Sequence, residues 1–419
     1  MEISHLRLRA AVRLAQGAGF LSRCAGRGSG IAVSGRILAA LAPDSLADLS
    51  TGVDCVLISA TNGKTTTTAM CNAVLASRYR TVSNSLGNNM TGGLVEALSR
   101  RGNADHAVLE VDESHLGLAI QATAPVAVVL MNLSRDQLDR VSEVRAVATR
   151  WLAALADAPN VKVIANVSDP LVYFAVAGHE LLVSVDLGSP WSLDASVCPR
   201  CDAPLEYSPD SRYHCSVCGF AMPECEYRLD GGIVKFRGNP VVKIESLLPG
   251  DFNLRNAAIA AVLGVEMGVS PAEIAQALGS VASVAGRYET VNIANHRVML
   301  LMAKNPAGWQ ATIAMLGGDS RDLVLAINAE IADGKDTSWL YDVDFSPLAN
   351  RRVVATGSRR SDLATRLFYD GVPHAVMGDP ISAIASLDTP EVVFVGNYTA
   401  FQGLRRSLVS RDPGLEVAT

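Results

Sequence analysis

The stretch "VDCVLISATNGKTTTTAMCNAV", residues 53–74, decides the fold of this chain. Its first eight residues form an apolar run that is typical of a buried parallel strand. A Gly-Lys-Thr turn and a helical pattern follow directly. This order is the setting in which a phosphate loop works, because backbone N–H groups and the helix N-terminus bind phosphate. A Gly-Lys-Thr turn that arose by chance is the alternative, and the flanking strand and helix speak against it.

The residues of this loop are the first candidate site. We expect Lys64 to reach the outer phosphate oxygens as a catalytic residue, and the Thr65 hydroxyl to ligate Mg²⁺. Ile58 stands where the general pattern has its first glycine, so this loop is a shorter variant. The predicted nucleotide-binding residues of the loop are Thr61, Asn62, Gly63, Lys64, Thr65 and Thr66.

Acidic residues follow the next apolar run, "HAVLEVDES" (106–114). Glu110 ends that run, where a second Mg²⁺ ligand would lie. Asp112 and Glu113 stay unassigned, because they could instead be solvated or structural.

The pattern along the chain predicts an α/β fold with more than one domain. Apolar runs at 126–134 and 161–169 alternate with helical patterns such as 141–157, which indicates a doubly wound parallel sheet. A ligand would bind at the carboxyl ends of these strands. A second strand–helix series begins after residue 291, and 419 residues are long for a single core. The predicted division is an N-terminal segment 1–47, an ATP-binding domain 48–291 and a smaller α/β domain 292–419.

Composition and charge exclude several classes of protein. Apolar residues make up 49% and charged residues 19%, which suits a compact chain and argues against disorder. The net charge of −6 gives no sign of nucleic-acid binding or of an anionic membrane surface. No stretch reaches the roughly 20 uncharged apolar residues of a membrane span. The Arg-containing start, "MEISHLRLRAAVRLAQGAGF", does not resemble a signal peptide, and a helix packed on its own domain is favoured over one on a membrane.

Four of the eight cysteines form two pairs, "CPRC" (198–201) and "CSVC" (215–218), in a differently composed segment at about 188–228. Two such pairs thirteen residues apart have zinc-ribbon spacing. Four thiolates complete a tetrahedral shell with no open position, so this zinc would be structural. A redox dithiol or an iron–sulfur cluster is the alternative. The predicted ligands are Cys198, Cys201, Cys215 and Cys218, and the absence of an export signal indicates a reducing cytoplasm.

Several motifs together resemble Mur-type ATP-dependent ligases. The loop reads x-T-N-G-K-T, and "NLSRDQLDR" (132–140) resembles a family segment whose metal-binding His is replaced here by Gln137. "GDFNLRNAAIAA" (250–261) resembles the segment that reads adenine, which nominates the nucleotide-binding pair Asn253 and Asn256. "AGRYE" (285–289) nominates Arg287 for phosphate. Singly these motifs are weak, since an Asn at a helix start is more often a cap.

One departure concerns the acceptor. Family members that add an amino acid usually carry a carbamylated lysine after the metal-binding His. The corresponding segment "AVATRWLAAL" (146–155) has Arg150 and no lysine.

The C-terminal region resembles the MurT family, the Mur-ligase-like subunits of lipid II isoglutaminyl synthase. The resemblance is carried by "LLMAKNPAGWQ" (300–310) and "LAINAEIADGKDTSWLYDVDF" (325–345). It implies a Mur-ligase central domain with a parallel sheet and phosphate loop, an inserted zinc ribbon and a smaller α/β C-terminal domain. It further implies ATP, Mg²⁺ and structural Zn²⁺ as cofactors.

The resemblance also implies a reaction and a partner. ATP would activate the α-carboxyl of D-glutamate in lipid II as an acyl phosphate, and ammonia from a GatD-like glutaminase subunit would give D-isoglutamine. An Asp of this chain would complete the partner's Cys-His pair as a catalytic residue; Asp342 is preferred to Asp336 and Asp344, and an exposed capped loop is the alternative for this segment. Such an enzyme would act in the cytoplasm at the inner face of the membrane, touching it through its substrate.

Two other hypotheses remain at this point. A free-standing Mur-type amino-acid ligase would need no partner. A zinc-ribbon scaffold that only retains nucleotide binding would not depend on Lys64, and the intact set of Lys64, Thr65 and Glu110 argues against it.

Overall fold

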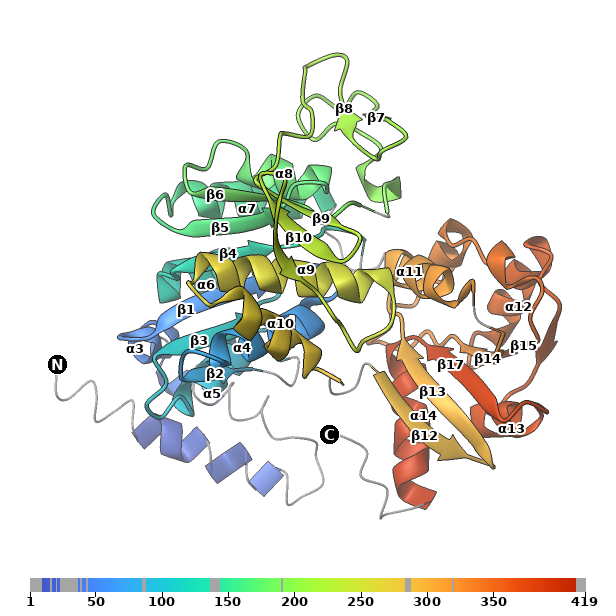
Figure 1. The fold of residues 1–419 in the computed structure, drawn as a ribbon. Coiled ribbons are helices and arrows are strands. Elements are labelled where there is room, and N and C mark those ends of the chain that lie inside the picture. Colours follow the sequence, from blue (N-terminus) through green and yellow to red (C-terminus); the bar gives the residue numbers. More distant parts are fainter. Residues whose placement is uncertain are drawn as a thin grey trace. The chain divides into compact units, whose positions relative to one another are not determined.

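The structure is a computed structural model. It describes residues 10–15, 17–19, 21–22, 37, 40–42, 44–84, 88–135, 144–189, 191–282, 288–318 and 320–411. The chain forms two compact units (Figure 1). The central unit comprises Met1–Leu133, Glu143–Leu247 and Phe252–Val281; the C-terminal unit comprises Ser134–Ser142, Leu248–Asp251 and Ala282–Thr419. Most of the predicted N-terminal segment 1–47 lies outside the described residues.

The central unit is built on a nine-stranded sheet of order β11-β10-β9-β6-β5-β4-β1-β3-β2. The strands from β2 to β9 pair in parallel, whereas β9, β10 and β11 form an antiparallel meander at one edge. The strands are β1 Asp54–Ser59, β2 Thr81–Ser83, β3 His106–Glu110, β4 Ala127–Leu130, β5 Lys162–Asn166, β6 Leu182–Asp186, β9 Tyr227–Asp230, β10 Ile233–Phe236 and β11 Asn239–Lys243.

Helices cover both faces of this sheet. One large apolar core joins alternate strand residues such as Leu57 and Leu109 to α5, α6, α7 and α8, while α4 and α10 pack together outside that core. The helices of the unit are α3 Ser45–Ser50, α4 Lys64–Ala76, α5 Thr91–Ser99, α6 Leu116–Thr123, α7 Val144–Ala156, α8 Pro170–Val176, α9 Asp251–Glu266 and α10 Pro271–Gly279.

Strand β1 lies between β3 and β4, and this placement positions the site. Its residues from Cys55 to Ser59 are all buried, as the continuous apolar run predicts. Because parallel strands end at the same edge, the residues that follow β3 and β4 flank the loop that follows β1. The predicted doubly wound parallel sheet is confirmed. The antiparallel meander was not predicted.

The cysteine-rich segment forms a small lobe between β6 and β9, with a short 3-10 helix Leu193–Ala195 and a hairpin of β7 Glu206–Tyr207 and β8 Tyr213–His214. Its core contains Tyr213 and Phe220, and the Phe220 ring stacks on Tyr173 of α8 at 5.4 Å between ring centroids. The Tyr213 hydroxyl donates to the Val167 carbonyl at 2.9 Å. The lobe is therefore packed onto the central unit and does not hang free of it.

The C-terminal unit is a second α/β layer structure. Its six-stranded sheet has the order β12-β13-β17-β14-β15-β16, with β12 antiparallel and the others parallel. Two separate apolar cores cover its faces. Its elements are β12 Tyr288–Ile293, β13 His296–Met302, α11 Pro306–Leu316, β14 Asp322–Ala326, 3-10 helices η2 Ser338–Asp342 and η3 Ser346–Leu348, β15 Val353–Thr356, α12 Arg360–Tyr369, β16 His374–Val376, α13 Pro380–Ala385, β17 Glu391–Gly396 and α14 Tyr398–Arg411.

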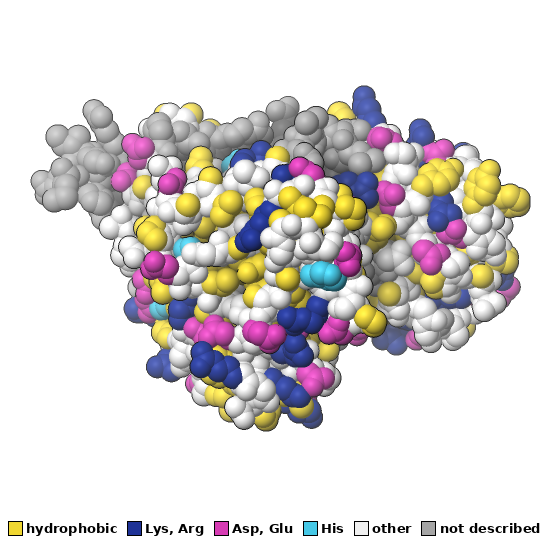
Figure 2. Space-filling view, turned by 90° about the horizontal axis from the view of Figure 1, so that it is seen from above, with side chains coloured by type: hydrophobic (Ala, Val, Ile, Leu, Met, Phe, Trp, Pro, Cys, Tyr) yellow, Lys and Arg dark blue, Asp and Glu magenta, His cyan; other side chains and the backbone are white. Residues whose placement is uncertain are grey.

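The face of the molecule drawn in Figure 2 carries both signs of charge. Figure 2 shows Lys and Arg side chains interleaved with Asp and Glu, as a chain with net charge −6 and 19% charged residues predicts. Among the described helices, none is long and apolar enough to cross a membrane.

Candidate nucleotide and metal site

The phosphate loop closes on a glycine at the start of α4. Gly63 precedes the helix with φ +82°, a backbone conformation that glycine adopts without strain. A Cβ at this position would meet the Asn256 Oδ1 atom at 2.8 Å. Helix α9 thus brings Asn256 against the loop, so two motifs nearly 200 residues apart share one site. Asn256 donates to the Asn253 Oδ1 atom at 3.3 Å, and both side chains are buried.

Asn132, which follows β4, fixes the other side of the loop. Its backbone carbonyl accepts from the Thr61 N–H at 3.0 Å, and its Oδ1 accepts from the Asn62 N–H at 2.9 Å. Its Nδ2 donates back to the Asn62 carbonyl at 3.0 Å. Sequence reasoning missed this role, although Asn132 opens the very segment that resembles the family motif.

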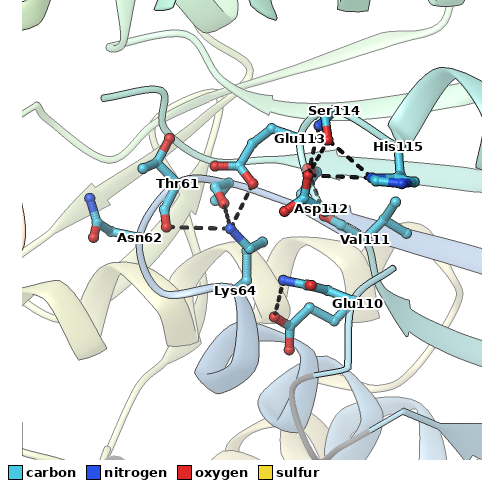
Figure 3. A network of polar contacts seen from close by, with 12 residues as sticks. Thr61, Asn62, Lys64, Glu110, Val111, Asp112, Glu113, Ser114 and His115 are labelled. Carbon is cyan, nitrogen blue, oxygen red and sulfur yellow. Dashed lines mark hydrogen bonds and ion pairs between the residues drawn. The ribbon is translucent and has the colours of Figure 1, made fainter. Parts of the chain in front are cut away.

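Lys64 is held by a carboxylate that had no predicted role. Its ammonium donates to a Glu113 carboxylate oxygen at 2.8 Å, and the two side chains are only 11% and 13% exposed. It also donates to the backbone carbonyls of Ala60 and Thr61. Figure 3 shows Glu113 directed at Lys64, whereas Asp112 turns toward Ser114 and His115. Glu113 therefore lies where a phosphate oxygen would be expected to meet the lysine.

Glu110 is the strongest sign of a cation. Its side chain is buried, with the residue 2% exposed, and Oε1 accepts from the Asn89 side-chain amide at 3.2 Å. Oε2 is buried with no hydrogen-bond partner among the described residues. A buried carboxylate with one neutral donor is unfavourable unless a cation joins it. Glu110 and the buried Thr65 hydroxyl group are thus suited to hold Mg²⁺ beside the phosphate loop.

One residue of the predicted site and one residue of a family motif fall outside the described structure. Arg287 lies there, as does Gln137. The loop residue Thr66 is described and is buried in the first turn of α4.

The four predicted zinc ligands come together. One sulfur atom from each of Cys198, Cys201, Cys215 and Cys218 lies within 4.8 Å of every other. The Cys198–Cys218 and Cys201–Cys215 sulfur pairs are 3.6 and 3.5 Å apart.

The backbone of the lobe favours the thiolate form of one of the four cysteines, Cys215. The Cys218 N–H lowers the pKa of the Cys215 thiol to about 7. Asp202 and Gly219, which follow the second cysteine of each pair, both take positive φ, as two matching knuckles require. The cluster fits a closed tetrahedral Zn²⁺ site and has no position left for a substrate.

The three candidate Asp residues of the C-terminal unit differ in their contacts. Asp336 and Asp344 accept the backbone N–H groups two residues on, from Ser338 at 2.8 Å and Ser346 at 2.9 Å. Asp342, at the end of η2, instead pairs with the Arg135 guanidinium at 3.1 Å. The Asp342 carboxylate is therefore bound by a cationic side chain, Arg135, whose place another cation could take. Asp336 and Asp344 instead cap local turns.

The same segment is tied down by buried groups. Trp339, Val343 and Phe345 are buried in the core on either side of Asp342. Asp333 accepts the Thr399 N–H at 2.9 Å and its hydroxyl, which joins the segment to the start of α14.

Two family models match this chain. The Mur ligase middle domain matches residues 58–186, and the MurT ligase C-terminal domain matches residues 302–401. Lipid II isoglutaminyl synthase (glutamine-hydrolyzing) subunit MurT of Staphylococcus aureus strain COL is 30% identical, over 85% of this chain and 86% of that protein. MurT of Streptococcus pneumoniae R6 is 28% identical, over 92% of this chain and 94% of that one.

Solved structures agree on the fold. A pseudomurein peptide ligase type C from Methanothermus fervidus has a TM-score of 0.66 at 19% identity, covering 86% of this chain and 79% of that one. MurF from Acinetobacter baumannii has a TM-score of 0.63 at 15% identity, covering 91% and 80%. Because the Staphylococcus aureus protein is 30% identical over 85% of this chain and the MurT ligase C-terminal domain matches residues 302–401, the chain belongs to the MurT family of Mur-ligase-like lipid II isoglutaminyl synthase subunits.

Proposed function

We propose that this chain is the ATP-dependent subunit that amidates the α-carboxyl of D-glutamate in the lipid II stem peptide. The observation that carries the ATP-dependent step is the buried Glu110 carboxylate on the strand next to β1, which leads into the phosphate loop. One of its oxygens has no partner among the residues that the structure describes. The names of the curated relatives supply the substrate class.

The reaction divides into two steps. A carboxylate oxygen of D-glutamate attacks the γ-phosphorus of ATP, ADP leaves, and an acyl phosphate forms. Ammonia then attacks the carbonyl carbon, the C–O bond to phosphate breaks, and phosphate leaves with D-isoglutamine as product. Activation is needed because phosphate is a far better leaving group than oxide or hydroxide.

The chain's own residues stabilise the first step. Lys64 turns from Glu113 to the transferred phosphoryl group, and the backbone N–H groups of the loop bind the remaining phosphate oxygens. Asn253 and Asn256 bind the adenine side of the nucleotide, and Arg287 contributes to phosphate binding. Thr65 and Glu110 would hold Mg²⁺, which supplies charge neutralisation on the phosphates when bound. The four-cysteine cluster would hold a structural Zn²⁺ ion.

Ammonia comes from a glutaminase partner of the GatD kind. Asp342 is the residue that we assign to the partner's Cys-His pair, where it would orient the imidazole as the third member of a triad does. Its replaceable pairing with Arg135 supports this choice over Asp336 and Asp344. We place this reaction in the cytoplasm at the inner face of the membrane, where lipid II is reached.

The free-standing amino-acid ligase is the second candidate, because the family of Mur ligases includes such enzymes. Arg150, which stands where a carbamylated lysine would be expected, weighs against it.

The test is amidation of lipid II by this chain with and without a glutaminase partner, with ammonium as a parallel nitrogen source. We expect glutamine to act as the nitrogen source only when both chains are present. Ammonium should act as the nitrogen source even when this chain is assayed without the partner. Ligation of an amino acid without a partner, with ammonium inert, would overturn the proposal.

A further inference from the structure

The loop between β2 and α5 is bonded to the end of β3. The buried Asn84 amide pairs with the Glu110 backbone in both directions, accepting from its N–H at 2.7 Å and donating to its carbonyl at 2.8 Å. Asn84 also donates to the Asn88 carbonyl at 3.0 Å, and the Asn89 carbonyl accepts from the Asp112 N–H at 2.9 Å. These bonds fix residues 88 and 89 over the carboxyl end of β3.

The packing of α5 allows little movement of Asn88 and Asn89. A Cβ at Gly93 in the first turn of α5 would lie 2.0 Å from the Asn88 carbonyl oxygen. Only glycine permits that approach, so the helix and the loop are closely packed. The Asn89 side chain is therefore presented to Glu110 from a fixed backbone.

Asn89 determines which Glu110 oxygen is available. Its amide donates to Oε1 at 3.2 Å, and Oε2 is left buried with no hydrogen-bond partner in the described part of the chain. Residues that hold a metal ligand in place in this manner commonly contribute to metal affinity.

We propose that Asn89 is a positioning residue for the metal ligand Glu110. It binds one carboxylate oxygen so that the other faces the cation that accompanies the nucleotide. This inference rests on the proposed function, which assigns Glu110 to Mg²⁺. A merely structural role, in which Asn89 only stabilises the loop, predicts no selective effect on the metal.

The test uses Mn²⁺ as a paramagnetic probe for Mg²⁺, with binding to the full chain followed by electron paramagnetic resonance in the presence of ADP. For Asn89→Ala we expect Mn²⁺ affinity to fall about tenfold, with ADP affinity in EDTA unchanged. Asn89→Ser should behave alike, because its shorter side chain does not reach Oε1. Asn88→Ala is the matched control, since Asn88 contributes its backbone carbonyl to this network, and it should bind Mn²⁺ as the unaltered chain does.

The outcomes separate the two levels of the argument. Mn²⁺ affinity of both Asn89 variants within twofold of the unaltered chain would overturn the positioning role. So would an equal loss of ADP affinity in EDTA, which would mark a structural role. If the unaltered chain itself bound no Mn²⁺ with ADP, the metal assignment of the proposed function would fail as well.

Discussion

At the scale of single residues, the pairing of Lys64 with Glu113 determines what nucleotide binding must do. The Nζ–carboxylate distance is 2.8 Å and both side chains are nearly buried. A phosphate that binds Lys64 must displace this carboxylate. Part of the attraction between lysine and phosphate is therefore offset by the loss of an existing pair.

The Glu113→Gln variant tests whether nucleotide binding has to break the Lys64–Glu113 ion pair. Without the Glu113 carboxylate, the nearly buried Lys64 ammonium loses a charged partner at 2.8 Å, so the nucleotide-free chain should lose about 1–3 kcal/mol of unfolding free energy. The phosphates of ADP would restore a counter-charge, so ADP in EDTA should raise the melting temperature more than it does for the unaltered chain. Thermal unfolding with and without ADP measures both effects.

Asp112→Asn is the control for that experiment, because Asp112 is the neighbouring carboxylate and bonds to Ser114 instead of Lys64. It should leave the response to ADP as it is. An ADP-induced shift in Glu113→Gln no larger than in the unaltered chain would refute the displacement argument.

At the scale of elements, we expect the cysteine lobe to depend on a bound metal ion. Its apolar core of Tyr213, Phe220 and a few neighbours is small, and a core of that size does not fold alone. Structural zinc in small lobes contributes on the order of 10 kcal/mol. The two turns with positive φ that follow Cys201 and Cys218 are the geometry in which both cysteine pairs can bind one ion.

Cys215→Ser should therefore lose bound zinc and unfold the lobe, while ADP binding at the distant phosphate loop stays within a few-fold. Metal analysis of the purified chain and near-ultraviolet circular dichroism measure the two effects. Cys225→Ser is the matched control, because Cys225 lies beside the lobe but outside the cluster. Retention of zinc by Cys215→Ser, or iron in place of zinc, would contradict the assignment.

The described segment from Asn328 to Phe345 is held in place by hydrogen bonds and not by a metal site. Asp333 is 7% exposed and accepts both the N–H and the hydroxyl of Thr399. Asp333→Asn would turn an amide donor toward one of these donors, so we expect a loss of about 1–3 kcal/mol. Hydrogen exchange across 328–345 should become faster.

Asp336→Asn is the comparison for that change, because Asp336 is exposed and accepts the N–H of its near neighbour Ser338. Its effect should stay within about 0.5 kcal/mol. Equal protection of the segment from hydrogen exchange in Asp333→Asn and in the unaltered chain would show that Asp333 does not hold the segment in place.

The sequence predicted those elements whose pattern is local. The buried runs that became β1, β3, β4 and β5, and the helix that became α9, have apolar periodicity that neighbours in sequence create. The meander β9 to β11 was missed, since its half-exposed strands alternate weakly and two of them have exposed ends. Short strands such as β2 are defined by the pairing partner more than by their own residues.

The residues of the site also fall into a group that the sequence predicts and a group that it does not. Lys64, Thr65, Glu110 and the four cysteines follow recognisable spacings, so they could be nominated. Asn89, Asn132 and Glu113 could not, because their importance arises only when β1, β3 and β4 place their ends together. From the sequence alone, an Asn-rich loop predicts only a turn.

At the scale of the whole molecule, the two units carry separable halves of the proposed reaction. The central unit holds the phosphate loop, Glu110 and the cysteine lobe, while the C-terminal unit holds the segment with Asp342. ATP-dependent activation is needed whatever the nitrogen source. The Asp342 carboxylate is needed only if ammonia comes from the glutaminase.

Two variants should therefore fail in different ways. Lys64→Ala should lower amidation at least 100-fold with either glutamine or ammonium, because phosphoryl transfer loses its main counter-charge.

Asp342→Asn should lower the glutamine-dependent rate of the two-chain complex by about 10⁴-fold, as loss of a triad orienting carboxylate does, and leave the ammonium-dependent rate unchanged. Asp344→Asn, which alters a turn-capping carboxylate two residues away, is the control and should retain both rates. Parallel assays with the two nitrogen sources decide the matter: an Asp342→Asn complex that lost both rates together would place Asp342 in the synthetase step and not in ammonia supply.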